Sequence, residues 1–242
     1  MIIYGINPVA EALRAGRASA VRIAERPNPR LQQLLALADE QGVRVRRVPA
    51  DVLDREARGG VHQGVVADVE DVKDYSLGDL VSGAAGVPLL VVLDGIEDPH
   101  NLGAILRTAD AAGVDGVVLQ SRRAAALGGA AAKASAGAVS HIRIAEVVNI
   151  ARALEELKEL GVWTVGLAGE AITPYGSIDF TVPTALVVGA EGTGLRRLVR
   201  EKCDFLAHIP MRGQVSSLNV SVAAGVALFE AVRQRGPQAP AK

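Results

Sequence analysis

The hydrophobic positions along the chain predict strands that alternate with helices. In residues 1–70 the strands are short and each helix carries an apolar stripe on one side, which is typical of a small α/β unit. An Asn–Pro pair at residues 7 and 8 indicates a helix start, because proline is favoured in the first helical turn. The expected helices are residues 9–15, 31–40 and 51–57, and the expected strands are residues 21–24, 43–48 and 64–69.

A second and stronger α/β pattern begins at residue 89. The continuous apolar run LLVVLD at residues 89–94 predicts a buried strand, and alternation of strands with helices predicts a parallel sheet covered on both faces. Further strands are expected at residues 116–120, 142–147, 162–167, 185–188 and 205–209, and helices at 101–112, 150–160, 195–202 and 218–233. Residues 71–88 lack strong periodicity, so we expect a linker with room for one helical turn and a domain boundary there.

Composition narrows the class of protein. Of the 242 residues 49% are hydrophobic but only 3% are aromatic, so the core is expected to consist of Ala, Val, Leu and Ile. A single cysteine, Cys203, excludes an internal disulfide and a cysteine-cluster metal site, and it suits a reducing cytoplasm. No apolar run is long enough to span a bilayer, and the first residues lack a signal-peptide pattern. We therefore expect a cytoplasmic protein without a membrane partner or a metal.

Charge alone does not identify a partner. The net charge of −1 gives no global attraction to nucleic acid, although a local basic patch is enough to bind RNA. Every Lys or Arg position in residues 1–70 is arginine, the residue that suits bidentate contacts to phosphate. High-GC codon usage gives the same bias, so both explanations stand.

Three expected strand ends in the second unit carry polar residues, and open parallel sheets bind ligands beyond the carboxyl ends of their strands. The first such segment is DGIEDPHNLGAILR, which contains His100, Asn101 and Arg107. Asn101 can cap the helix that follows, and Arg107 lies off the apolar stripe of that helix. Taken alone, a capping Asn, a solvated Arg and a solvated loop His explain this segment.

The second segment, VVGAEGTGLRRLV at residues 187–199, resembles a nucleotide-binding turn but has a different glycine spacing. Its order is G-x-x-G-x-G, which matches neither the dinucleotide fingerprint nor the phosphate loop. Glu191 stands inside the turn, where it would repel a phosphate. A tight turn explains the glycines, and Glu191 suits the dipole of the next helix, but this does not explain why an acid lies among the glycines.

The third segment runs from Ile209 to Arg235. Ser217 and Asn219 are good candidates for helix caps. The helix that follows is apolar almost all round and contains small residues, so it is expected to be buried on more than one side, with a homodimer interface as one natural use.

The order of these segments resembles the SPOUT superfamily of RNA methyltransferases, and within it the TrmH-like 2′-O-ribose methyltransferases. The family carries an N-x5-R element, here Asn101 and Arg107, and later a G-x-E-G turn that contains Glu191. An I-P-M-x-G-x-x-x-S-L-N-V-S element follows, here residues 209–221. KASAGA at residues 133–138 also resembles a family segment.

The resemblance implies a fold, a cofactor and an assembly. The catalytic domain would be a parallel-sheet SPOUT domain with a C-terminal trefoil knot, which holds S-adenosylmethionine through backbone groups of Gly189, Ile209 and Leu218. A cofactor without phosphate explains why neither phosphate fingerprint is present. The knot and the last helix would form a homodimer.

The resemblance also implies roles at the reacting centre. Arg107 would act on the ribose 2′-hydroxyl, and Asn101 would position Arg107 or the ribose. Glu191, Ser217 and Asn219 would order the pocket and the target nucleotide. The family proposal makes Arg107 a base, but a guanidinium is effectively always protonated, so we prefer a clamp on phosphate and developing alkoxide.

The first seventy residues refine the match. IYGINPVAEALRAG and GVHQGVVADV resemble the start and end of the L30e-like RNA-binding domain of the RlmB branch, whose members methylate a guanosine ribose in 23S rRNA. The expected organisation is an L30e-like substrate-binding domain (1–70), a linker (71–88) and a SPOUT domain (89–242). A tRNA substrate, a non-catalytic RNA-binding role and a dinucleotide-dependent enzyme are the alternatives.

Overall fold

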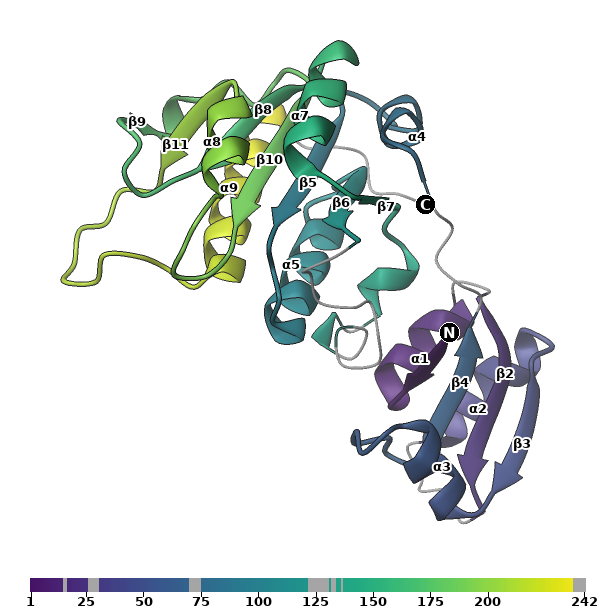
Figure 1. The fold of residues 1–242 in the computed structure, drawn as a ribbon. Coiled ribbons are helices and arrows are strands. Elements are labelled where there is room, and N and C mark those ends of the chain that lie inside the picture. Colours follow the sequence, from purple (N-terminus) through teal and green to yellow (C-terminus); the bar gives the residue numbers. More distant parts are fainter. Residues whose placement is uncertain are drawn as a thin grey trace.

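The computed structural model describes residues 1–14, 17–25, 31–69, 75–121, 131, 134–135 and 137–236. Within these residues the strands form two separate sheets, one of four strands and one of seven (Figure 1). Each sheet has its own buried apolar side chains, which confirms the expected α/β class with a small first unit and a larger second one.

The small sheet has the strand order β1-β4-β2-β3, in which β2 and β3 are parallel and the other pairs are antiparallel. Helices α1 and α2 pack on one face, and α3 packs on the other. The element bounds are β1 Ile2–Tyr4, α1 Ile6–Arg14, β2 Ala18–Ala24, α2 Leu31–Glu40, β3 Arg44–Val48, α3 Ala50–Glu56 and β4 Val65–Val69.

The first helix and the first strand of this unit differ from the expectation. Helix α1 begins at Ile6, so Asn7 and Pro8 lie within its first turn, where a missing N–H costs no hydrogen bond. Strand β1 was not expected as a separate strand, because three residues are too few to show a period.

The large sheet has the strand order β7-β6-β5-β10-β8-β11-β9, and every pairing in it is parallel. This confirms the predicted parallel sheet. The strand bounds are β5 Leu89–Asp94, β6 Gly116–Gln120, β7 Ile144–Val147, β8 Trp163–Leu167, β9 Thr173–Pro174, β10 Thr184–Gly189 and β11 Phe205–His208. The trefoil knot that the resemblance implies stays a prediction.

Helices cover both faces of the large sheet, because alternate residues of its central strands point to opposite sides. On β5, Leu89, Val91 and Leu93 pack toward α5 and α9, whereas Leu90 and Val92 pack toward α4, α7 and α8. The helix bounds are α4 Leu77–Ser82, α5 Pro99–Ala111, α7 Ile150–Glu159, α8 Arg197–Lys202 and α9 Val220–Arg235, with short 3-10 helices η1 Ala138–Ser140 and η2 Tyr175–Ser177.

The segment expected to be a linker contains helix α4. Ser76 and Asp79 form a capping box at its start, and Leu77 and Leu80 are buried among side chains of the large sheet. A Cβ added at Gly116 would lie 2.6 Å from Leu80, so α4 packs directly on strand β6. Helix α4 is therefore part of the second core.

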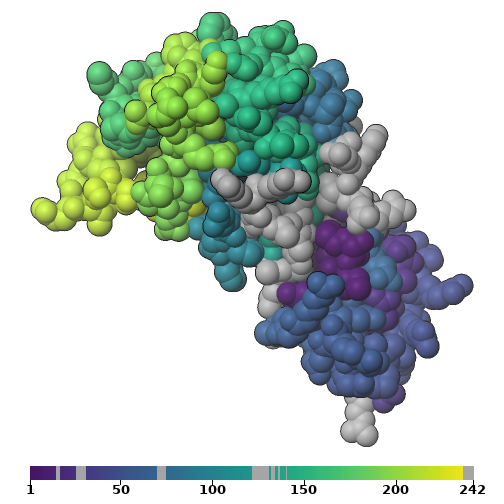
Figure 2. All heavy atoms as spheres, viewed as in Figure 1, coloured from purple at the N-terminus to yellow at the C-terminus, as the bar shows by residue number. Residues whose placement is uncertain are grey.

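The two units touch at helix α1 and the segment around η1. Arg17 donates a hydrogen bond from Nη1 to the Val139 carbonyl (3.2 Å), and His141 Nε2 lies 3.3 Å from Glu11 Oε2. Figure 2 shows the units as two lobes with α1, in purple, at their junction.

Within the KASAGA segment, residues 133–138, positions 133 and 136 lie outside the described residues.

Candidate active site

The glycine-rich turn after β10 closes on itself. Ala190 and Gly194 exchange two backbone hydrogen bonds of 3.1 and 2.8 Å. A Cβ at Gly189 would lie 2.2 Å from the Gly194 carbonyl carbon, so only glycine fits there, and Gly192 and Gly194 have positive φ values. The glycines thus serve the turn itself, and the turn presents Glu191.

Glu191 is joined to two asparagines that come from distant parts of the chain. Asn101 donates from Nδ2 to Glu191 Oε2 at 3.0 Å, and Asn219 donates from Nδ2 to Asn101 Oδ1 at 3.0 Å. Asn219 Nδ2 also lies 3.5 Å from Glu191 Oε1. This network answers why an acid stands among the glycines: its carboxylate accepts hydrogen bonds from both amides.

Asn101 does not cap helix α5, contrary to one of the expectations above. The cap is Asp98, whose carboxylate accepts from the backbone N–H groups of His100 and Asn101, and Pro99 takes the first helical position. Asn101 therefore lies inside the first turn, 8% exposed, with its amide turned toward Glu191 and Asn219. Because Asp98 caps the helix, the Asn101 side chain is free for the site.

Asn219 caps helix α9, as expected, and Ser217 does not. Asn219 Oδ1 accepts from the Ser221 backbone N–H at 2.9 Å and from the Ser221 hydroxyl at 2.6 Å. The same side chain thus fixes the start of α9 and contacts Asn101. Ser217 is exposed in the loop before the helix.

Two clefts flank this network. The first, about 370 Å³, is lined by Asn101, Glu191 and Val220 together with Gly95, Ile96, Glu97, Asp98, Ala190 and Thr193. The second, about 150 Å³, is lined by Ile209, Ser217 and Leu218 together with Leu167, Ala168, Gly169, Ala207, His208, Met211, Ser216 and Ala223. Asn219 lies in the chain between Leu218 of one cleft and Val220 of the other. Gly189 lines neither cleft.

The loop at residues 209–218 leaves its polar backbone groups available. Across the residues that the structure describes, no hydrogen bond involves this loop. The cleft beside it combines apolar side chains, such as Leu167 and Met211, with these N–H and C=O groups and with the Ser217 hydroxyl. Such a cleft suits a ligand that has one flat apolar part and several hydrogen-bonding groups.

Arg107 stands apart from the network. It lies on helix α5, six residues beyond Asn101, and is exposed as its position off the apolar stripe predicted. No hydrogen bond or ion pair engages its side chain among the described residues. The structure therefore joins Asn101, Glu191 and Asn219, and leaves Arg107 and Ser217 unattached.

Sequence reasoning missed an ion pair beneath the turn, between a buried aspartate and an exposed arginine. Asp94, at the end of β5 and 1% exposed, accepts from the Arg196 backbone N–H at 2.9 Å and from Arg196 Nε at 2.6 Å. Arg196 Nη2 also donates to Gln120 Oε1 at 2.8 Å, so the ends of β5 and β6 are tied to the turn after β10. In the sequence, the only indication of this pair was that an acid, Asp94, ends the apolar run LLVVLD.

The described part of the chain holds neither a candidate metal centre nor a membrane-spanning helix. No group of three or more His, Cys, Asp or Glu side chains there has the arrangement of a metal site. Among the same residues, none of the helices has the length and apolar character that crossing a membrane requires.

The sequence model of the SpoU rRNA methylase family matches residues 88–229. The chain belongs to this family. A second model, described as RNA 2′-O ribose methyltransferase substrate binding, matches residues 2–75. All eight candidate site residues lie between Asn101 and Asn219, inside the SpoU match.

Relatives of this SpoU-family chain match over almost their whole length. A 23S rRNA (guanosine-2′-O-)-methyltransferase RlmB from Pseudomonas syringae pv. tomato is 48% identical over 239 residues, 96% of this chain and 95% of the relative. A putative TrmH family tRNA/rRNA methyltransferase, YacO, from Bacillus subtilis is 46% identical, over 97% of this chain and 96% of its own. The crystal structure of the SpoU methyltransferase AviRb from Streptomyces viridochromogenes, in complex with AdoMet, superposes with a TM-score of 0.81 at 26% identity, covering 97% of this chain and 90% of the other.

Proposed function

We propose that this SpoU-family chain transfers a methyl group from S-adenosylmethionine to the ribose 2′-hydroxyl of a guanosine in 23S rRNA. The observation that carries the proposal is the Asn101–Glu191–Asn219 network, which joins three family motifs between two clefts. The 48% identity to a 23S rRNA guanosine methyltransferase supports the choice of substrate.

The 150 Å³ cleft is the proposed cofactor site. Its apolar walls suit an adenine ring, and the unengaged backbone of residues 209–218 suits the ring nitrogens and the ribose hydroxyls. Ile209 and Leu218 would hold the cofactor through backbone groups, and Gly189 would act by shaping the turn above β10. When bound, S-adenosylmethionine supplies an electrophilic methyl group on a sulfonium.

The 370 Å³ cleft is the proposed place of the target nucleotide. The Asn101 and Glu191 side chains line it, and Asn219 fixes the orientation of the Asn101 amide. Holding the ribose hydroxyl in line with the methyl group is the main task of these residues, since positioning alone can supply about 7–11 kcal/mol in favourable cases. Ser217, at the neighbouring cleft, would order the loop between cofactor and nucleotide.

Arg107 would act as a clamp on phosphate and on the developing alkoxide. Its exposed guanidinium, which no described side chain engages, is available to an incoming RNA strand. A planar fork of donors suits such contacts.

We further propose a homodimer through helix α9, acting in the cytoplasm where rRNA is made and modified. Val222 and Phe229 are 50% and 51% exposed, and the half-buried Val226 lies between them at the i, i+4, i+7 spacing of one helix face. A row of exposed apolar side chains on a helix supports a protein interface.

The experiment that tests the reaction and its substrate is a map of 2′-O-methyl sites on total RNA from cells with and without the gene. We expect one guanosine of 23S rRNA to lose its methyl group. Loss of a methyl group from tRNA instead would support the alternative of a tRNA substrate, which the name of the B. subtilis relative includes. An unchanged map would contradict the methyltransferase proposal.

Cofactor binding is tested separately, by calorimetry with S-adenosylmethionine in the presence of a chelator. We expect binding under these conditions, because the proposed site uses backbone groups and apolar side chains. Binding that returns only when a metal is restored would contradict this prediction.

A further inference from the structure

The arginines of the first unit fall into two groups. Arg22 and Arg55 are engaged by acids, Arg22 by Asp68 and Glu56 and Arg55 by Asp51. In contrast, among the described residues no hydrogen bond or ion pair engages the exposed side chains of Arg44, Arg46, Arg47 and Arg58. Three of these unengaged cations lie on β3, the edge strand of the small sheet.

Arg44 and Arg46 point to the same side of β3, because alternate residues of a strand share a face. The parallel register places Arg44 beside Ala20 and Arg46 beside Arg22 on β2. The opposite face, with Val21 and Ile23, is filled by helices α1 and α2. Arg44 and Arg46 therefore belong to the face on which α3 packs.

Helix α3 covers only part of that face. Its contacts include Val48 and Val66, at the end of the sheet where β3 finishes. At the other end, the register aligns Ile2, Asp68, Ala20 and Arg44 in one row across the sheet, and each of these side chains is exposed or half-buried. This half of the face is open to solvent, with small Ala20 as its floor and Arg44 and Arg46 along its rim.

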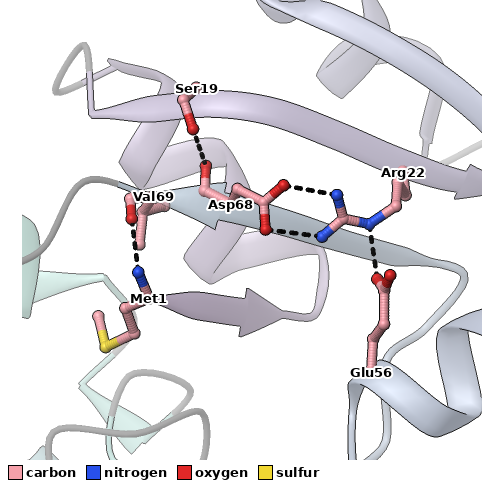
Figure 3. Close-up of polar contacts among 6 residues, drawn as sticks. All are labelled: Met1, Ser19, Arg22, Glu56, Asp68 and Val69. Atoms are coloured by element: carbon pink, nitrogen blue, oxygen red, sulfur yellow. Dashed lines mark hydrogen bonds and ion pairs between the residues drawn. The ribbon is translucent and has the colours of Figure 1, made fainter.

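Arg22 and Asp68 also lie on this face, but they engage each other and so add no free charge to it. Arg22 donates two parallel hydrogen bonds to Asp68, of 2.5 and 2.8 Å, and a third from Nε to Glu56 at 2.6 Å (Figure 3). The hydrogen bonds to Asp68 raise the pKa of Arg22, and those from Arg22 lower the pKa of Asp68. Because these groups satisfy one another, the unengaged charge at this face comes from Arg44 and Arg46.

We propose that this open half-face is where the first unit grips the RNA substrate, with Arg44 and Arg46 on backbone phosphates of a single-stranded segment. The inference rests on the proposed function, since it takes the substrate to be RNA. The unit matches a substrate-binding family model, so RNA is the partner with complementary charge. Guanidinium groups suit phosphate oxygens, and the small side chain of Ala20 beside Arg44 leaves room for the strand.

Protection of an exposed edge strand is the competing explanation. Charged side chains on an edge strand prevent pairing with the edge of another sheet, and arginine serves that purpose well. Glutamate serves it equally, whereas it repels phosphate. Replacement of arginine by glutamate therefore separates the two roles.

The test compares full-length Arg46→Glu with Arg152→Glu, which makes the same change of charge at an exposed arginine of α7. Binding to unmodified 23S rRNA transcript is measured at several salt concentrations. We expect Arg46→Glu to weaken binding and Arg44→Glu/Arg46→Glu to weaken it on the order of tenfold. The slope of log K against log salt should fall by about 0.7 for each phosphate that the variant no longer binds. Cofactor affinity and turnover at saturating rRNA should stay unchanged.

Equal rRNA affinity of Arg46→Glu and Arg152→Glu would overturn the inference. If the glutamate variants do not fold, Arg44→Gln/Arg46→Gln provides the same comparison. We expect the slope of log K against log salt to be smaller for this variant than for the wild type. An unchanged slope would overturn the inference. Wild-type protein that fails to methylate 23S rRNA would instead contradict the proposed function. If the wild type and the glutamate variants methylate 23S rRNA with the same KM for the rRNA, the role of the sheet face is contradicted and the proposed function is not.

Discussion

At the scale of single residues, Asn101 and Glu191 can take part in the candidate site because neighbouring residues perform the local structural roles. Asn101 is available to Glu191 because Asp98 caps helix α5. Glu191 is available to both asparagines because the turn around it closes through Ala190 and Gly194. Two asparagines and a glutamate, residue types that are common at helix caps and in turns, thus form one hydrogen-bonded unit.

Arg107 gives the sharpest test at this scale. If it were only a solvated helix residue, Arg107→Ala would change stability by no more than about 0.5 kcal/mol and leave activity intact. We expect the change to abolish turnover while cofactor binding and assembly survive. Single-turnover methylation at saturating cofactor measures this, and full activity of Arg107→Ala would remove Arg107 from the mechanism.

Arg107→Lys separates the clamp from the base. Lysine keeps the charge but loses the planar fork, and it loses its proton far more readily than arginine does. A clamp should therefore lose most activity at every pH. Substantial activity of Arg107→Lys with a shifted pH–rate profile would favour the base.

At the scale of elements, single charged side chains hold strands and helices in register. Arg22 links β2 to β4 through Asp68 and to α3 through Glu56. Asp94 and Arg196 do the same for the ends of β5 and β6 and the turn after β10. Helix α9 is fixed at its start by Asn219 and presents an apolar row beyond it.

The Arg22–Asp68 pair predicts a dependence of stability on pH. Hydrogen bonding by Arg22 lowers the pKa of Asp68 below its ordinary value of 3.8. Stability from the pair is therefore complete above the unfolded pKa and is lost as pH falls through the folded one. We expect Asp68→Asn to lower the free energy of unfolding at about pH 6, with the difference from wild type shrinking below about pH 4.

Denaturant unfolding across this pH range measures the difference. Asp51→Asn is the matched control, because the Asp51–Arg55 pair is exposed on both sides and surface pairs contribute little. A wild-type advantage over Asp68→Asn that stays constant from about pH 6 to about pH 3 would contradict the prediction.

The row Val222, Val226 and Phe229 predicts where the dimer can be broken. We expect Val222→Glu and Phe229→Glu to give monomers with reduced activity, because each places a charge in an apolar interface. Val148→Glu is the control, since Val148 is 74% exposed and follows β7, the edge strand of the large sheet. Sedimentation at micromolar concentration measures the state, and a monomeric wild type would contradict the dimer.

Ala227, on the same helix, is not a suitable position for testing the interface. Its side chain is fully buried against the core of its own chain, together with Ala224 and Leu228. A charge at Ala227 would disrupt the packing of α9 on the sheet. Loss of the dimer in that variant would therefore say nothing about the interface.

At the scale of the whole molecule, the chain consists of two cores that meet at α1 and η1. Helix α4 lies in the stretch that was expected to be a linker, but it packs on the large sheet and so belongs to the second unit. A stable fragment of the second unit should therefore begin before helix α4.

A fragment of residues 75–242 should fold and bind cofactor, but it should lose most activity on rRNA, because it lacks the unit that matches the substrate-binding model. A fragment of residues 89–242 should be less stable, since it lacks Leu77 and Leu80 and exposes the side chains that they cover. Thermal unfolding and calorimetry compare the two. Methylation of rRNA by the longer fragment at the full-length rate would mean that the first unit does not select the substrate.

The sequence by itself determined the α/β class, the parallel sheet and the order of the motifs, because period and strand-end chemistry are local properties that survive without knowledge of contacts. Through family resemblance it also predicted Asn101, Glu191 and Asn219 as site residues. Only the tertiary structure decided that these three share hydrogen bonds, that Asp98 is the cap of α5, and that α4 belongs to the second core. Those facts depend on which distant segments meet, and residues 90 or more positions apart in the chain leave no periodic trace of their contact.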